Sequence, residues 1–137
     1  MTVADFALRF VNSLVPGSFN DARLMLSKDC EYQYQGKVLK GPEIIKAFEE
    51  SHERAVETLD KIEYLEGQVL SENSNEIVIR VFDKIFLNGK IHTYSDRLAV
   101  KAIYQDQAWH VTSIEHRPFE EERAKLKDFL ASAAPKI

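Results

Sequence analysis

Titratable side chains that could carry acid–base chemistry gather in two neighbouring runs of the sequence. Asp83 lies in EIVIRVFDKIFL, and His92, Tyr94 and Asp96 lie in KIHTYSDRLAVKAI. They are interspersed with apolar residues, and a carboxyl or imidazole group held in apolar surroundings can acquire a pKa suited to proton transfer. These residue types favour acid–base chemistry, provided that the fold brings them to one surface.

Asn88-Gly89, between the two runs, determines which side chains share that surface. An Asn-Gly pair between alternating runs predicts a type I′ hairpin turn, because both central residues need a positive φ. One face of the hairpin then pairs Ile77 with Val100, Ile79 with Leu98, Val81 with Asp96, Asp83 with Tyr94 and Ile85 with His92. This face grades from apolar to polar, and we expect it to be the inner one.

The last strand adds residues to the predicted inner face. A loop of two or four residues centred on Asp106-Gln107 pairs Tyr104 with Trp109, Ala102 with Val111, Val100 with Ser113, Leu98 with Glu115 and Asp96 with Arg117. A three-residue turn or a β-bulge would reverse the faces of this strand. Apolar walls with a few convergent polar groups are typical of a ligand pocket, so we expect a pocket here.

Hydrophobic periodicity places the remaining elements. Helices are predicted over residues 3–15, 18–26, 42–59 and 119–134, and further strands over 30–35, 62–72 and 109–117. Phe10 lies on the apolar side of the first helix and His52 on that of the third. In the strand over 30–35, alternation buries Cys30, Tyr32 and Tyr34. Residues 36–40 are expected to form a loop.

Length and composition restrict the possible functions. With 137 residues, of which 45% are hydrophobic and 29% charged, the chain fits a single domain over 1–137, with 119–134 as a C-terminal helical extension. A net charge of −4 without a basic stripe argues against nucleic-acid binding. A lone cysteine, no signal-peptide pattern and no apolar stretch of membrane-spanning length predict a cytoplasmic protein without a membrane partner. No histidine spacing suits a metal, and we expect neither a metal nor a cofactor.

The order of the elements resembles that of the NTF2-like superfamily, which includes SnoaL-like and ketosteroid-isomerase-like proteins. Three features carry the resemblance: GPEIIKAF over 41–48, the central hairpin, and AWHV over 108–111. It covers about residues 3–118 and implies an α+β fold in which a cone-shaped, curved antiparallel sheet wraps around N-terminal helices, as in cystatin-like proteins. It also implies an apolar pocket and, often, a homodimer through the outer sheet face. That face is predicted to carry Val78, Phe82, Phe86, Ile91 and Ile114.

The catalytic residues of the family match this sequence only in part. Tyr34 falls where ketosteroid-isomerase-like members have a carboxylate base, Phe10 falls where they have a tyrosine, and Asp96 matches their hydrogen-bond-donating aspartic acid. Steroid-type isomerisation is therefore disfavoured. Limonene-epoxide-hydrolase-like members use two aspartates bridged by an arginine; Asp83, Asp96 and Arg117 supply these residue types, but not at that branch's spacing.

Two functions remain open. In the first, the domain binds a small hydrophobic molecule and acts as a cofactor-independent cyclase, dehydratase, isomerase or hydrolase. The candidate catalytic residues are Asp96, Asp83, His52, Tyr34 and Arg117, and the candidate ligand-binding residues are Phe10, Tyr32, Tyr94, His92, Leu98, Trp109 and Glu115. In the second, the domain is a non-catalytic dimeric module that binds a ligand or a protein partner. The same side chains also have structural interpretations, such as an Asp96–Arg117 cross-strand pair.

Overall fold

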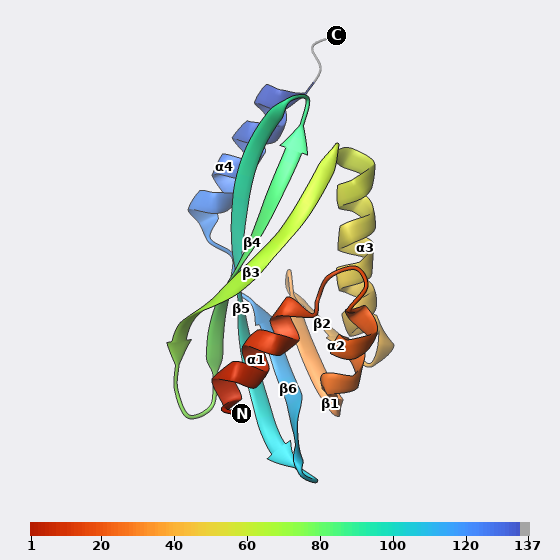
Figure 1. Ribbon diagram of the computed structural model, residues 1–137, viewed down its shortest axis with the longest axis vertical. Coiled ribbons are helices and arrows are strands. Elements are labelled where there is room, and N and C mark those ends of the chain that lie inside the picture. Colours follow the sequence, from red (N-terminus) through yellow and green to blue (C-terminus); the bar gives the residue numbers. More distant parts are fainter. Residues whose placement is uncertain (135–137) are drawn as a thin grey trace.

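A computed structural model describes residues 1–134. Its elements are, in order, α1 (Val3–Asn12), α2 (Phe19–Met25), β1 (Leu26–Tyr34), β2 (Lys37–Lys40), α3 (Pro42–Thr58), β3 (Lys61–Glu72), β4 (Ile77–Leu87), β5 (Lys90–Gln105), β6 (Ala108–His116) and α4 (Glu120–Ala133). Figure 1 shows the long strands β3, β4 and β5 between α3 on one side and α4 on the other. All the predicted helices and strands are therefore present, and β2 is an additional strand where a loop was expected.

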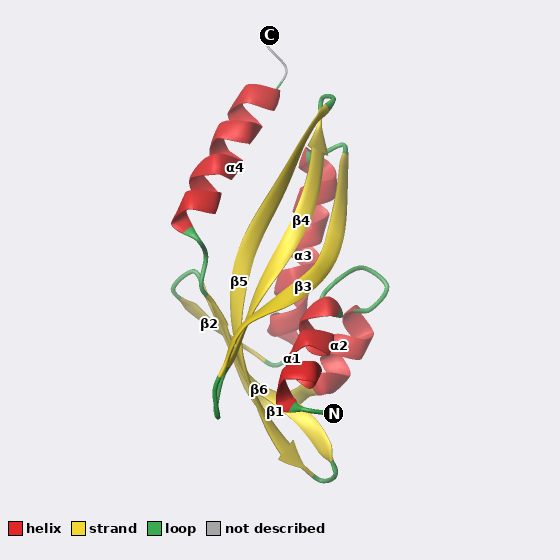
Figure 2. Ribbon diagram, turned by 60° about the vertical axis from the view of Figure 1, so that its left-hand side comes forward, coloured by secondary structure: helices red, strands yellow, loops and turns green. Residues whose placement is uncertain are grey.

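The described strands form one six-stranded sheet in the order β2-β1-β6-β5-β4-β3. The β1–β6 pair is parallel and the other neighbouring pairs are antiparallel, so the sheet is mixed and not wholly antiparallel as predicted. The sheet is strongly curved, with α1, α2 and α3 on one side of it (Figure 2). The α+β class, the curved sheet and the C-terminal helix are confirmed.

The β4–β5 hairpin has the predicted register. Asn88 and Gly89 have φ angles of 50° and 78°, as a type I′ turn requires. Every predicted pair occurs, from Leu87 with Lys90 at the turn to Ile77 with Val100 at the far end. The polar half of the inner face therefore carries Asp83, His92, Tyr94 and Asp96.

The pairing of β6 with β5 follows the prediction only as far as Val111. Val111 pairs with Ala102 as expected, but Lys101 pairs with Ser113, so Thr112 is an extra residue. Such a β-bulge reverses the faces of the residues beyond it, because side chains alternate along a strand with a period of two.

The bulge changes which residues of β6 face the sheet interior. Leu98 pairs with His116 and not with Glu115. The backbone N–H of Arg117 donates to the carbonyl oxygen of Arg97, a residue of the outer face, at 2.9 Å. The predictions that Glu115 and Arg117 point inward are wrong for this reason. The assignment of Ile114 to the outer face is wrong for the same reason, since its side chain is fully buried in the core.

The core lies between the apolar half of the inner face and the helices. Phe10 on α1 and Ile44 on α3 are fully buried in it. A capping box between Thr2 and Asp5 begins α1, and Pro42 occupies the first turn of α3, where a missing N–H costs nothing. No helix within residues 1–134 combines the length and the apolar character needed to cross a membrane.

α4 packs against β5, which extends past the last residue of β6. The end of this helix is held at the hairpin turn, because Asn88 Nδ2 donates to the carbonyl of Ala133 and Lys90 Nζ donates to the carbonyl of Ser132. α4 therefore covers strand residues that β6 leaves without a neighbour.

Candidate functional site

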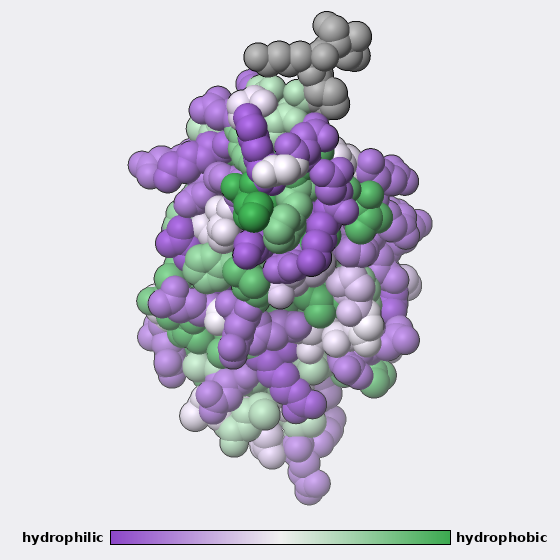
Figure 3. Space-filling view, turned by 45° about the horizontal axis from the view of Figure 1, so that its top comes forward, coloured by the Kyte–Doolittle hydropathy of each residue, from purple (hydrophilic) through white to green (hydrophobic). Residues whose placement is uncertain are grey.

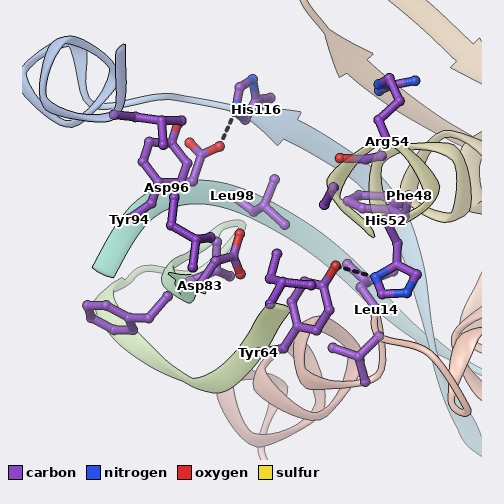
Figure 4. A pocket seen from close by; sticks show the side chains of 18 of the residues that line it. Leu14, Phe48, His52, Arg54, Tyr64, Asp83, Tyr94, Asp96, Leu98 and His116 are labelled. Carbon is purple, nitrogen blue, oxygen red and sulfur yellow. Dashed lines mark hydrogen bonds and ion pairs between the residues drawn. The ribbon is translucent and has the colours of Figure 1, made fainter. Parts of the chain in front are cut away.

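A cavity of about 950 Å³ lies between the inner sheet face and helices α3 and α4. Its apolar walls include Phe48 on α3, Leu98 on β5 and Leu126 on α4. Its carboxyl groups come from β4 and β5, and its other polar groups come from the neighbouring strands and helices (Figure 4 for the labelled residues). Figure 3 shows the molecule with the top of Figure 1 tilted forward, and on this face hydrophobic and hydrophilic side chains are interspersed. The volume is within the range of about 300–1,000 Å³ that is usual for small-molecule sites.

Asp83 contributes a carboxyl group with unusual acidity to this cavity. Burial, and then the negative charge of Asp96, raise its pKa from 3.8 to about 7. Burial and then the charge of Asp83 raise the pKa of Tyr64 to about 12, and burial and then the charge of Asp96 raise the pKa of Tyr94 to about 12. A carboxyl group with a pKa near neutrality can both donate and accept a proton at physiological pH.

Asp96 lies on the same face and binds an imidazole. His116 Nε2 donates to Asp96 Oδ2 at 2.6 Å, and the Arg97 backbone N–H donates to Asp96 Oδ1 at 2.8 Å. The side chains of His116 and Asp96 are 8% and 20% exposed, and the Tyr34 ring packs on the imidazole with centroids 5.2 Å apart. With its Nε2 proton directed at Asp96, a neutral His116 has Nδ1 as the acceptor atom.

A second histidine pair lies on the opposite wall. His52 Nδ1, on α3, is hydrogen-bonded to the Tyr64 hydroxyl, on β3, at 2.6 Å (Figure 4). Beside it, Tyr32 stacks on Phe48 and on Tyr34, with centroids 4.9 Å and 5.3 Å apart. This wall offers flat aromatic surface with one imidazole–phenol pair.

Seven of the twelve candidate residues line the cavity. They are Asp83, Asp96, His52, Tyr32, Tyr34, Tyr94 and Leu98. The sheet register and the N-terminal elements therefore bring most of the predicted polar and aromatic groups together.

The other five candidates lie elsewhere. Phe10 is in the core, and Trp109 lies beside Phe6 with ring centroids 6.3 Å apart. His92 stacks on Phe129 of α4 at 5.1 Å, and its buried Nε2 has no hydrogen-bond partner in the part of the chain that the structure describes.

Arg117 and Glu115 form an ion-pair cluster outside the cavity. Arg117 binds both carboxylate oxygens of Glu76 at 2.8 Å and one oxygen of Glu115 at 3.0 Å. The expected pair of Arg117 with Asp96 is therefore absent from the described residues, and His116 occupies the position beside Asp96.

Several polar residues that line the cavity were not predicted from the sequence, and two of them, Tyr64 and His116, are hydrogen-bonded to predicted residues. Tyr64 was recognisable, because Ile62 and Tyr64 alternate with the charged Lys61 and Glu63 in the strand over 62–72. His116 alternates with Glu115 and Arg117, so the predicted pairing that turned those two residues inward left it on the outer face; the bulge places it inside. Across residues 1–134, no group of three or more His, Cys, Asp or Glu side chains is arranged to hold a metal ion.

Comparison with known proteins identifies relatives by structure alone. A scan against protein-family models gives no match, and neither does a search of curated proteins. Among solved structures, an NTF2-like protein with a cystatin-like fold from Novosphingobium aromaticivorans matches with a TM-score of 0.60 and 14% identity, over 90% of this chain and 86% of that one.

Two further structures, for which an activity has only been suggested, have the same fold. A protein from Xanthomonas campestris pv. campestris described as a polyketide cyclase matches with a TM-score of 0.59 and 11% identity, over 97% of this chain and 100% of that one. A protein from Shewanella frigidimarina described as a ketosteroid isomerase matches with a TM-score of 0.54 and 16% identity, over 82% and 92%. Likeness at this level of identity establishes a fold and not an activity. The chain therefore has the fold of these NTF2-like structures.

Proposed function

We propose that the cavity binds a small, largely apolar molecule and catalyses proton transfer on it without a cofactor. The observation that carries this proposal is the contrast between two carboxyl groups on one apolar cavity wall. Asp83 is buried and lies near the negative charge of Asp96, and both raise its pKa. Asp96, in contrast, accepts hydrogen bonds from His116 Nε2 and from the backbone N–H of Arg97. Titratable groups in different environments can take opposite roles in acid–base catalysis.

The geometry suggests a role for each group. Asp83, protonated over part of the neutral range, would donate a proton to a carbonyl or a departing hydroxyl oxygen of the ligand. His116, oriented by Asp96, would accept a proton at Nδ1, and Asp96 would stabilise the imidazolium that forms. Tyr32, Tyr34 and Leu98 would hold the apolar body of the ligand.

This pair of roles serves cyclisation, dehydration, isomerisation and hydrolysis alike. The structural neighbours described as a polyketide cyclase and a ketosteroid isomerase support chemistry of this class. The isomerase-type arrangement itself is not favoured, because Tyr34 and Phe10 occupy the positions of that family's base and tyrosine.

A non-catalytic binding function is the second candidate. The hydrogen bond between His116 and Asp96 favours it, because both groups are already paired in the absence of a ligand. In that case the two side chains stabilise the cavity and the ligand is held by the apolar walls.

Deuterium exchange distinguishes the two functions. The protein would be incubated in D₂O with a mixture of small cyclic ketones and enones, with binding followed by NMR and deuterium uptake beside the carbonyl followed by mass spectrometry. We expect uptake that Asp83→Asn and His116→Gln each reduce by about 100-fold or more, and that Asp128→Asn, an exposed carboxyl change outside the cavity, leaves unchanged. Binding without exchange or conversion would favour the non-catalytic function, and no binding at all would contradict both.

We also propose that the outer sheet face forms a homodimer interface. Ile91, Leu65 and Leu70 are 57%, 45% and 43% exposed, which leaves apolar surface available for association. Arg80 and Lys84 lie over the Phe82 and Phe86 rings on the same face, respectively, so the interface would contain cation–π contacts. Sedimentation at micromolar concentration should show a dimer that Ile91→Lys dissociates, and a monomer unaffected by that change would contradict the proposal.

A further inference from the structure

Three cationic side chains line the cavity, and all three come from helices. Arg54 is on α3, and Arg123 and Lys127 are on α4. The two on α4 are four residues apart and therefore lie on the same face of that helix. The carboxyl groups that line the cavity, those of Asp83 and Asp96, are on β4 and β5. The positive and negative groups are thus divided between the helical walls and the strand wall (Figure 4 for Arg54, Asp83 and Asp96).

The charge of this lining contrasts with that of the whole chain. The chain has 22 acidic residues against 18 lysines and arginines, a net charge of −4. In the cavity, three cations face two carboxyl groups, and the pKa of about 7 leaves Asp83 partly protonated at neutral pH. The cavity lining therefore carries a net positive charge in an acidic protein.

The cations have little internal compensation. Among the described residues, no carboxylate lies within ion-pair distance of Arg54 or Lys127. The contact of Arg123 with Glu120 is long, at 3.7 Å, and the Glu120 side chain is 80% exposed, so it is screened by solvent. These side chains remain able to pair with an anionic group of a ligand.

We propose that the ligand of this cavity is an amphipathic organic anion, an apolar molecule that carries one carboxylate or a chemically similar group. This inference rests on the proposed function only in taking the cavity as a ligand site. The anionic group lies against the helical cations, because the carboxylate of Asp96 would repel it from the strand wall. The apolar body packs on the aromatic wall, and a neutral reacting group reaches Asp83 and His116. The charges thereby fix the orientation in which the ligand enters.

Two fluorescent probes with the same scaffold test this inference. Phenylnaphthylamine is neutral, and anilinonaphthalene sulfonate adds one anionic group to a closely related aromatic body. We expect the sulfonate to bind more tightly, and Arg54→Gln, Arg123→Gln and Lys127→Gln each to weaken its binding by about two- to five-fold with no change for the neutral probe. Added salt should reduce the difference between the probes, because ions screen exposed charges.

Matched variants control for general effects of charge removal. Lys46→Gln on α3 and Lys125→Gln on α4 remove cations from the same helices at positions that do not line the cavity, and we expect unchanged affinity for both probes. Equal affinity of the two probes for the unmodified protein, or equal losses in the control variants, would overturn the inference and leave the binding function intact. Failure of both probes to bind would count against the binding function as well.

Discussion

Replacement of Asp83 by asparagine tests the electrostatics of the cavity directly. In the folded protein, burial and the charge of Asp96 raise the pKa of Asp83 to about 7, from an ordinary value of 3.8. As the pH rises between these values, the unfolded chain loses the proton while the folded protein keeps it, so the free energy of unfolding falls. Each unit of difference between the two pKa values corresponds to about 1.36 kcal/mol. Ionisation of Asp83 therefore costs the folded protein up to about 4 kcal/mol.

Asparagine has nearly the same shape as aspartic acid and no charge, so the free energy of unfolding of the variant should not fall with pH on account of this position. We expect Asp83→Asn to be close to the unmodified protein in stability near about pH 4 and progressively more stable toward about pH 8. Urea denaturation across this range measures the difference, and Asp128→Asn serves as the exposed control. A difference between protein and variant that is constant across the range, or an NMR titration of the Asp83 carboxyl with a midpoint near 4, would refute the reasoning.

Three further substitutions test the supporting structure, and each is measured by urea denaturation at fixed pH. Tyr64→Phe removes the hydroxyl that lies 2.6 Å from His52 Nδ1 and should lower the free energy of unfolding by about 1–2 kcal/mol; an unchanged value would mean that His52 is satisfied in another way. Gly67→Ala places a Cβ 3.1 Å from Cγ2 of Ile79 and should cost about 1–3 kcal/mol, so a neutral result would show that the core yields there. Gly89→Ala forces an alanine to a φ of 78° and should cost about 1–2 kcal/mol, unless the turn changes its type.

The parts of the fold that were predicted correctly depend on local signals. Asn88-Gly89 requires positive φ angles that few other residue pairs adopt, and this one turn sets the pairing of the whole β4–β5 hairpin. The faces of Asp83 and Asp96 follow from it without any knowledge of the rest of the chain. β2 was missed because its turn is formed by Gln35 and Gly36, at φ angles of 50° and 77°, and glutamine is not a residue that indicates such a turn.

The parts of the site that were not predicted depend on long-range packing. The sequence around Thr112 carries no glycine or other mark of a bulge, and the extra residue is apparent only when β5 and β6 are paired. The helical periodicity of residues 119–134 predicts a helix but not the surface on which it packs. The contribution of Arg123 and Lys127 to the cavity was therefore outside the reach of sequence reasoning.

The extra residue at Thr112 determines the chemistry of the cavity as well as the register of a strand. In a regular strand, Arg117 would lie opposite Asp96, and a guanidinium there would favour the ionised carboxylate and offset the negative charge that now acts on Asp83. With the bulge, Arg117 is bound by Glu76 on the outer side, and His116 donates to Asp96 instead. The two aspartates consequently differ in their environments. Asp96 accepts two hydrogen bonds, whereas the causes that act on the pKa of Asp83 are burial and the charge of Asp96. Since acid–base catalysis by two carboxyl groups depends on such a difference, the bulge is the feature of the chain on which the proposed function depends most.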